Sequence, residues 1–401
     1  MGRRAIFGAF LISLAAVAAF LIFGTNLRNP VVQVEDFSAK ATSDLAVFPA
    51  REISNSNNEI NVASAATENI KLSNPPEKIN AVYATSWSAG SSSKIDYLLS
   101  LIKATKANAL VIDIKDFSGR IAYATGDGEL STYEANPLRI KNVEALVNKL
   151  HSENVYAIAR IVVFQDPVLA LARPDLAIKD LKTGETWKDN KGLAWVDPAS
   201  QEVWDYNAHL AKNAFAKGFD EVNFDYVRFP SDGSLDNMSF PFYDESKAKQ
   251  EVIKDFFGFL RESLEGEIIS VDLFGLVTSA SDDMGIGQHL EDAYGNFDFI
   301  CPMVYPSHFA SGFIGFKDPA AHPYEVVKYS GEEAVKRLTA LAGENKEPLT
   351  KLRPWLQDFS LGYTYGSEEV KLQIQAVEET SNAGWMLWDP RNNYTKTGFS
   401  E

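Results

Sequence analysis

The sequence predicts a (β/α)₈ barrel over residues 76–401, behind an apolar amino-terminal segment and a polar linker. Three observations support this prediction. Eight short apolar segments typical of buried strands recur along the chain, and amphipathic helical patterns separate most of them. Acidic and aromatic residues gather where these segments end. The competing fold, an open doubly wound sheet, often carries a glycine-rich dinucleotide loop, and no such loop follows any of the strands.

The chain begins with a basic and then apolar segment. Arg3 and Arg4 precede the stretch Ala5–Gly24, which carries no charge and is long enough to cross a membrane as a helix. No convincing small-x-small cleavage site follows, so we expect an uncleaved signal anchor over residues 1–28. The basic residues would stay in the cytoplasm, and the barrel would lie on the extracytoplasmic side, in the cell envelope. The alternative is a cleaved signal peptide and a secreted protein.

Residues 29–75 separate this segment from the barrel. They are rich in Ser, Asn, Ala and Glu, and they show no sustained hydrophobic period. Such a composition cannot bury enough apolar surface to offset the entropy of ordering, which predicts a flexible, disordered linker. Pro75 and Pro76 mark its end.

The composition limits the partners. The formal net charge of −16 argues against a nucleic acid or an anionic membrane surface, since both require a basic face. Membrane contact is therefore expected only through the amino-terminal helix. Cys301 is the single cysteine and lies in an apolar run, so we interpret it as a small core residue. No cofactor is expected.

The expected strands are short apolar runs bounded by turn residues: Ile79–Thr85, Ala109–Lys115, Tyr156–Phe164, Glu221–Tyr226, Ile268–Phe274, Phe297–Val304, Leu352–Asp358 and Gly384–Trp388. The expected helices carry apolar residues at helical spacing: Ser93–Lys106, Val143–Glu153, Gln201–Lys217, Lys247–Leu264, Gly331–Leu341 and Glu368–Ser381. Longer insertions follow three of the strands, where a barrel places its binding loops: Asp166–Pro198, Ser231–Ser246 and Ser307–Tyr329.

The fourth expected strand indicates a functional site. Its apolar residues alternate with Asn223 and Asp225, so the apolar set can pack outward while the acid and the amide share the opposite face. Pro230 cannot donate to a sheet, so the strand ends before it, with Arg228 close by. The alternative is that Asp225 only caps a loop or pairs with Arg228.

The same alternation places several charged side chains inside the barrel. Asp113 and Lys115 share one face of the second strand, and Asp272 lies on the polar face of the fifth strand, opposite its apolar residues. Buried charges are costly unless they are paired or used. Asp113 could pair with Lys115 or with Arg160 of the third strand. That pairing leaves Asp225 and Asp272 without an obvious partner.

Most glycoside hydrolases use two carboxyl groups, and here two such groups lie on neighbouring strands. We expect Asp225 to be the nucleophile and Asp272 the general acid/base, with Asp358 and Asp389 as alternatives for the acid. The expected substrate-binding residues are polar and aromatic groups at the strand ends: Trp87, Asp113, Lys115, Arg160, Asn223, Arg228, Tyr305, Gln357 and Trp388. Trp355 is a further aromatic residue suited to stacking on a sugar.

From about Ile79 to Tyr394 the chain resembles the glycoside-hydrolase domain family of bacterial exported proteins, which is distantly similar to α-amylase-like (β/α)₈ glycosidases. Seven segments at successive strand ends carry the resemblance: Tyr83–Gly90, Val111–Asp116, Ala159–Phe164, Asn223–Pro230, Val271–Gly275, Pro302–His308 and Trp388–Pro390. The resemblance implies a barrel and a carbohydrate substrate. Asp225 matches the strand-four nucleophile of α-amylase-like enzymes. Those enzymes have a Glu after the next strand, where this chain has Asp272.

Two other functions remain open at this point. One is a carbohydrate-binding barrel of the cell envelope without turnover, which would keep the aromatic residues. The other is a metal-dependent hydrolase that uses the acids as ligands. The chain has five histidines, of which only His308 lies at an expected strand end, and it lacks the His-x-His and His-Glu-x-x-His spacings. We therefore favour a retaining glycosidase that cleaves a polysaccharide or an oligosaccharide.

Overall fold

The structure is a computed structural model, and it describes residues 71–343, 348, 350–381 and 383–400. The signal anchor predicted for residues 1–28 lies outside these residues, as does the predicted linker apart from residues 71–75. Among the described residues, no helix combines the length and the apolar character needed to cross a membrane.

Nine strands of the described part of the chain form one closed sheet in which every pairing is parallel. In chain order they are β1 (Ile79–Ala84), β2 (Ala109–Lys115), β3 (Tyr156–Val162), β5 (Glu221–Asp225), β7 (Ile268–Phe274), β8 (Phe299–Met303), β9 (Lys351–Leu352), β10 (Trp355–Gln357) and β11 (Gly384–Trp388). β9 and β10 are two parts of the seventh barrel strand, interrupted at Arg353 and Pro354. β11 pairs with β1, and β10 pairs with β8, which closes the ring. The predicted eight-stranded barrel is confirmed.

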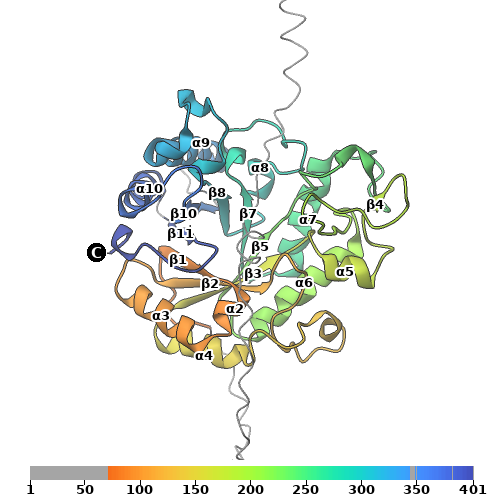
Figure 1. Cartoon of the computed structure of the whole chain (residues 1–401), viewed down its shortest axis with the longest axis horizontal. Helices are drawn as coiled ribbons and strands as arrows, with labels where there is room; N and C mark the ends of the chain where they lie inside the picture. The colour runs from red at the N-terminus through yellow and green to blue at the C-terminus, as the bar shows by residue number, and fades with distance from the viewer. Residues whose placement is uncertain (1–70, 344–347, 349, 382, 401) are drawn as a thin grey trace, which may run out of the picture. The chain divides into compact units, whose positions relative to one another are not determined.

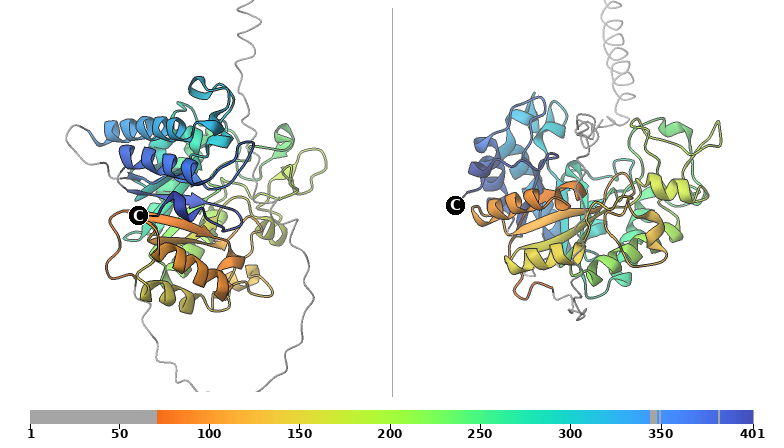
Figure 2. Two further views of the ribbon diagram at one scale, coloured as in Figure 1. Left: turned by 60° about the vertical axis from the view of Figure 1, so that its left-hand side comes forward. Right: turned by 60° about the horizontal axis from the view of Figure 1, so that its bottom comes forward.

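Helices surround the sheet on its outer side (Figures 1 and 2). The longer ones are α3 (Ser92–Lys103), α4 (Val143–Ser152), α6 (Gln201–Ala216), α7 (Lys249–Ser263), α9 (Pro323–Ala342) and α10 (Ser367–Thr380). Three short helices, α2 (Ser86–Ala89), α5 (Pro167–Ala172) and α8 (Leu290–Ala293), lie in the connections. The prediction for α9 began too late: the helix starts at Pro323, because proline is favoured in a first helical turn.

The side chains of each strand divide between two cores. Ala81, Val111 and Ile158 belong to the core inside the barrel. Their neighbours Val82 and Ile112 belong to the larger core between the strands and the helices. This alternation is the period of two that the sequence shows.

The amino-terminal end of the barrel is closed by side chains. Leu72 is 9% exposed and belongs to the inner core, and its backbone N–H donates to Asp220 Oδ1 at 2.7 Å. Above it, Glu221 and Arg353 are fully buried and form a two-pronged ion pair. Function must therefore lie at the other end, where the carboxyl ends of the strands form the mouth.

Two of the predicted insertions meet beside the mouth. β4 (Lys179–Asp180), in the connection after β3, pairs antiparallel with β6 (Met238–Ser239), in the connection after β5. The third predicted insertion is shorter than expected, because α9 occupies its last residues.

Candidate active site

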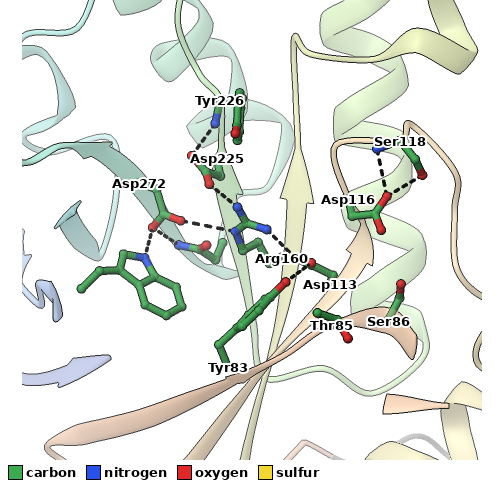
Figure 3. Close-up of polar contacts among 12 residues, drawn as sticks. Tyr83, Thr85, Ser86, Asp113, Asp116, Ser118, Arg160, Asp225, Tyr226 and Asp272 are labelled. Carbon is green, nitrogen blue, oxygen red and sulfur yellow. Dashed lines mark hydrogen bonds and ion pairs between the residues drawn. The ribbon is translucent and has the colours of Figure 1, made fainter. Parts of the chain in front are cut away.

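Arg160 is the centre of the polar cluster inside the mouth (Figure 3). Its Nη1 donates to Asp113 Oδ1 at 2.5 Å, and its Nη2 donates to Asp225 Oδ2. Its Nε lies 3.7 Å from Asp272 Oδ2. The prediction that Asp225 lacks a partner is therefore wrong, because one guanidinium faces all three carboxyl groups.

The register of the sheet brings these residues together. Asp113 on β2 lies opposite Arg160 on β3, and Arg160 lies opposite Asn223 on β5. Asp225 lies two residues further along β5, on the same face as Asn223. The three acids and Arg160 are each at most 5% exposed, so their interactions take place in a largely dry environment.

Asp272 on β7 is held by neutral donors. Its Oδ1 accepts from Asn223 Nδ2 at 2.8 Å and from Trp355 Nε1 at 2.7 Å. Burial raises the pKa of Asp272 well above its ordinary value, and the charge of Asp225 raises it further; Arg160 and the two hydrogen bonds oppose the shift only in part.

The pKa of Asp113 is also raised, to about 6, chiefly by burial. Arg160 and the hydrogen bond from the Tyr83 hydroxyl oppose this shift. Three carboxyl groups therefore share one cation. Full ionisation would leave two excess negative charges in a buried site, so the cluster retains a proton that solvent-exposed acids would lose.

Asp225 ends β5 at a sharp turn of the backbone. Tyr226, the next residue, has a left-handed φ of 55°, and its backbone N–H donates to Asp225 Oδ1 at 2.6 Å. Both oxygens of Asp225 therefore accept a hydrogen bond, from the backbone on one side and from Arg160 on the other. This fixes the orientation of the carboxylate.

An aromatic wall lies beside the cluster. The rings of Tyr83 and Trp388 stack with centroids 4.0 Å apart, and Trp355 meets Trp388 edge-on at 5.7 Å. The Arg160 guanidinium lies 5.2 Å from the Trp388 ring. Trp355 is only 1% exposed and donates to Asp272, so it positions an acid and is not the exposed stacking surface that the sequence suggested.

Tyr305, which follows β8, is close enough to sense both carboxyl groups. Its pKa is raised by burial first and then by the charges of Asp272 and Asp225. The side chain is 8% exposed. It therefore belongs to the same cluster as the acids, and its role in substrate binding stays a prediction.

Lys115 does not enter the barrel, so the prediction for its side chain is wrong. Its Nζ donates to Asp166 Oδ2 at 2.8 Å and to Asn207 Oδ1 of α6 at 3.0 Å, on the outer side. The pairing of β2 with β3 shifts register between Asp113 and Lys115. Such an irregularity turns the following side chain to the opposite face. The predicted pair between Asp113 and Lys115 does not form.

Three other predicted substrate-binding residues occupy different surroundings. The Gln357 amide holds the loop after β8, because its Oε1 accepts from Ser307 N and Oγ. The Arg228 guanidinium lies between aromatic rings, 4.9 Å from Trp195 and 4.8 Å from Phe274. Trp87, on α2, is 61% exposed.

The Trp87 indole is supported from below by Arg139. The guanidinium lies 5.0 Å from the ring. It is fixed by Asp116 Oδ2 at 2.5 Å, by Ser118 Oγ at 2.9 Å and by Ser86 Oγ at 3.1 Å. An exposed aromatic ring on a rigid cationic support is thus presented beside the mouth.

The two alternative acids are engaged in holding loops. Asp358 accepts from the backbone N–H of Thr395 at 2.8 Å and from its hydroxyl at 2.6 Å. Asp389 Oδ1 accepts from the backbone N–H groups of Arg391 and Asn393. Among the described residues, Arg160 pairs with Asp113, Asp225 and Asp272 and with neither of these two acids, so Asp272 is the better candidate for the acid.

Sequence reasoning missed Tyr83 as a site residue. Tyr83 lies in the expected first strand but is not among the predicted site residues, yet its hydroxyl donates to Asp113. The inward face of β1, which Tyr83 shares with Ala81, was the available signal. In the described part of the chain, no group of three or more His, Cys, Asp or Glu side chains is arranged to hold a metal ion.

A closed parallel barrel that presents paired carboxyl groups at its mouth has the architecture of the (β/α)₈ glycosidases. Comparison with known families agrees. Residues 81–394 match the family described as "putative glycosyl hydrolase domain". The chain belongs to this family, and the predicted resemblance and the predicted glycosidase class are confirmed.

Solved structures similar to this chain include the following three. A hypothetical protein from Ruminiclostridium thermocellum is 35% identical, over 51% of this chain and 98% of that protein, with a TM-score of 0.44. The glycoside hydrolase domain of PgaB (BpsB) from Bordetella bronchiseptica is 14% identical over 79% of this chain and 94% of that domain, with a TM-score of 0.55. Flavobacterium johnsoniae chitobiase is 11% identical over 82% of this chain and 49% of the chitobiase chain, with a TM-score of 0.50. No curated protein matches the chain.

Proposed function

We propose that this protein hydrolyses a glycosidic bond of a polysaccharide or an oligosaccharide, with retention of configuration at the anomeric carbon. Asp225 is the nucleophile and Asp272 is the general acid/base. The observation that carries the proposal is the contrast between the two acids: both face Arg160, but Asp225 forms a close ion pair with it, whereas Asp272 lies 3.7 Å from its Nε and has a pKa raised by burial. Two carboxyl groups in such different environments suit an acid and a nucleophile.

The reaction follows from these positions. Asp272 transfers its proton to the glycosidic oxygen as that bond breaks, and Asp225 attacks the anomeric carbon to form a covalent ester. The ionised Asp272 then removes a proton from a water molecule, which displaces Asp225 and releases the sugar. Asp272 ends the cycle protonated and Asp225 ionised, as they began.

The positive charge that develops on the sugar would be stabilised by the negative cluster. Arg160 keeps the Asp225 carboxylate oriented through its contact with Oδ2, and Tyr226 N–H holds the other oxygen. Trp388, which is half-buried and stacks on Tyr83, supplies an aromatic ring on which the sugar bound at the cluster can pack.

We propose a substrate of several sugars, because Trp87 offers a second stacking surface outside the cluster. Trp87→Ala should lower kcat/KM on long oligosaccharides by up to about tenfold, since stacking on an aromatic ring contributes about 0.5–1.5 kcal/mol. It should leave a small aryl glycoside unaffected. An equal loss on both substrates would contradict a separate sugar-binding position at Trp87.

A carbohydrate-binding barrel without turnover is the second candidate. It is favoured by one observation: both oxygens of Asp225 already accept hydrogen bonds from the protein. A screen of defined oligosaccharides separates the two functions. The proposal predicts that the wild type hydrolyses an oligosaccharide and that Asp225→Asn does not. If the wild type and Asp225→Asn both bind an oligosaccharide and neither hydrolyses it, the second candidate is supported.

We also propose that the barrel acts outside the cytoplasm, held at the membrane by the segment 5–24. The support is the length and apolar character of that segment and the preceding Arg3 and Arg4. The intact chain should remain in the membrane fraction after high-salt washing. A mature amino terminus near residue 25 in the soluble fraction would instead show a cleaved signal peptide.

A further inference from the structure

A series of hydrogen bonds runs from Glu221 and Arg353, near the amino-terminal end of the barrel, to Asp272, the proposed acid. At this end, the Arg353 guanidinium binds both oxygens of Glu221. Ser270 Oγ donates to Glu221 Oε1 at 2.5 Å and lies 3.0 Å from Asn223 Nδ2. Asn223 Nδ2 in turn lies 2.8 Å from Asp272 Oδ1. Of these residues, only Asp272 is exposed at all, at 1%.

The ion pair between Glu221 and Arg353 determines the direction of every hydrogen bond in this series. Glu221 is paired with a guanidinium and is therefore an acceptor, so the Ser270 hydroxyl must give its only hydrogen to Glu221. Ser270 can then only accept from Asn223. The side of the Asn223 amide that faces Ser270 and Asp272 must consequently be the NH₂ group, which donates one hydrogen to each.

The opposite orientation of the amide would leave two acceptors facing each other. Asn223 Oδ1 would then lie against Ser270 Oγ, whose hydrogen is already used, and against Asp272 Oδ1. In the observed orientation Asn223 Oδ1 is buried and, among the described residues, has no hydrogen-bond partner. The amide therefore leaves its own acceptor unsatisfied to keep its donors on Ser270 and Asp272.

The consequence reaches the acid itself. Asp272 Oδ1 accepts from two N–H groups, those of Asn223 and Trp355, and these occupy both of its lone pairs. A proton on the Asp272 carboxyl group must therefore reside on Oδ2, the oxygen on the side of Arg160.

We propose that Ser270 is a positioning residue for Asp272: by fixing the orientation of the Asn223 amide, its hydroxyl confines the acidic proton to Oδ2. The inference rests on the proposed function only for the use of that proton in catalysis. The placement of the proton follows from the hydrogen bonds alone.

Other charged groups also act on Asp272, and they come from several elements. Asp225 of β5 and Arg160 of β3 face it directly. Tyr305, after β8, and Cys301 of β8 are close enough for its charge to raise their pKa, an effect secondary to burial in both. None of these groups is altered by a change at Ser270.

Ser270→Ala removes the acceptor that holds the amide. Asn223 can then turn its oxygen toward Asp272 Oδ1, so a donor that favours the ionised carboxylate is replaced by an acceptor that favours the protonated form. The pKa of Asp272 should rise in this variant by about one to two units, because the ionised carboxylate loses a hydrogen bond that stabilises its charge. Ser270→Thr retains the hydroxyl and is the matched control.

The Trp355 indole N–H reports on Asp272 without any need for substrate, because it donates to Oδ1. Its ¹H–¹⁵N resonance, assigned with Trp355→Phe, is followed between pH 4 and pH 10 in the intact protein. We expect a midpoint that is lost in Asp272→Asn, rises in Ser270→Ala and is restored in Ser270→Thr. Superimposable curves for the wild type and Ser270→Ala overturn the proposal. If Ser270→Ala does not fold, Ser270→Cys should give a smaller rise, and an unchanged midpoint overturns it equally.

Activity provides the second arm. A general acid must be protonated, so the rate falls as the pH rises through its pKa. In Ser270→Ala, the pH at which the rate falls on the alkaline side of the profile should rise by the same amount as the midpoint of the indole resonance. If the midpoint of the resonance shifts but the pH–rate profile does not, the placement of the proton stands and the acid role of Asp272 is contradicted. If the rate is lower but neither the midpoint nor the profile shifts, the role of Ser270 is purely structural and the proposal is overturned.

Discussion

Asp225→Asn removes the proposed nucleophile while it changes the shape of the side chain little. An amide cannot form the covalent ester, so turnover should fall by at least about 10³-fold, which corresponds to about 4 kcal/mol of transition-state stabilisation. The substitution also removes one of the three negative charges that face Arg160.

The cost in stability should nevertheless be small. Breaking a buried ion pair costs about 3–5 kcal/mol when it leaves a charge without compensation. Here Arg160 keeps its 2.5 Å bond to Asp113, and Asp272 loses an unfavourable neighbour. We therefore expect the free energy of unfolding to change by no more than about 1–2 kcal/mol.

Asp113→Asn is the matched control, because it removes the same charge from the same guanidinium. Turnover on the best oligosaccharide of the screen and denaturant unfolding are measured for both variants. The two should have similar stability, but only Asp225→Asn should lose nearly all turnover. The reasoning is refuted if Asp225→Asn stays active within tenfold and unfolds far more easily, or if both variants lose turnover equally.

Three further predictions follow from single residues. Asp272→Ala should spare substrates with good leaving groups, such as nitrophenyl glycosides, far more than natural linkages, and an equal loss of kcat/KM on both would count against an acid role. Burial raises the pKa of Asp358 to about 6, above its value in the unfolded chain, so its contribution to stability is present near pH 4 and is lost as the pH rises through 6. The free energy of unfolding of Asp358→Asn, relative to that of the wild type, should therefore rise by up to about 3 kcal/mol between pH 4 and pH 8. A difference that stays constant with pH in denaturant unfolding would exclude this linkage. A fragment of residues 71–401 should fold, and one of residues 76–401 should fold with about 2–4 kcal/mol less stability, because it lacks the Leu72 side chain and its bond to Asp220; equal unfolding curves would show that Leu72 is dispensable.

The barrel could be predicted because each strand repeats one simple pattern. β2, β7 and β11 begin and end as the sequence indicates, since an apolar run bounded by turn residues leaves little choice. The inward direction of Asp113, Asn223 and Asp272 follows from the same period of two. The start of α9 was missed although Pro323, Val326 and Val327 are buried at helical spacing in its first turns.

The arrangement of the charges could not be predicted in the same way. The local sequence of β2 contains no sign of the register shift that turns Lys115 outward, because the shift arises from its pairing with β3. Which acids Arg160 would bind depends on the stagger between β2, β3 and β5, a property of the closed sheet. The role of Glu221 and Arg353 beneath the site was likewise invisible, since 132 residues separate them in the chain.

The anomeric configuration of the first product tests the central claim most directly. The oligosaccharide that the screen identifies is hydrolysed in an NMR tube, and the anomeric proton of the new reducing end is recorded before mutarotation. A nucleophilic Asp225 with Asp272 as acid/base predicts that this product has the configuration of the bond that was cleaved. A first product of the opposite configuration would contradict the account, because it would mean that water, and not Asp225, attacks the anomeric carbon.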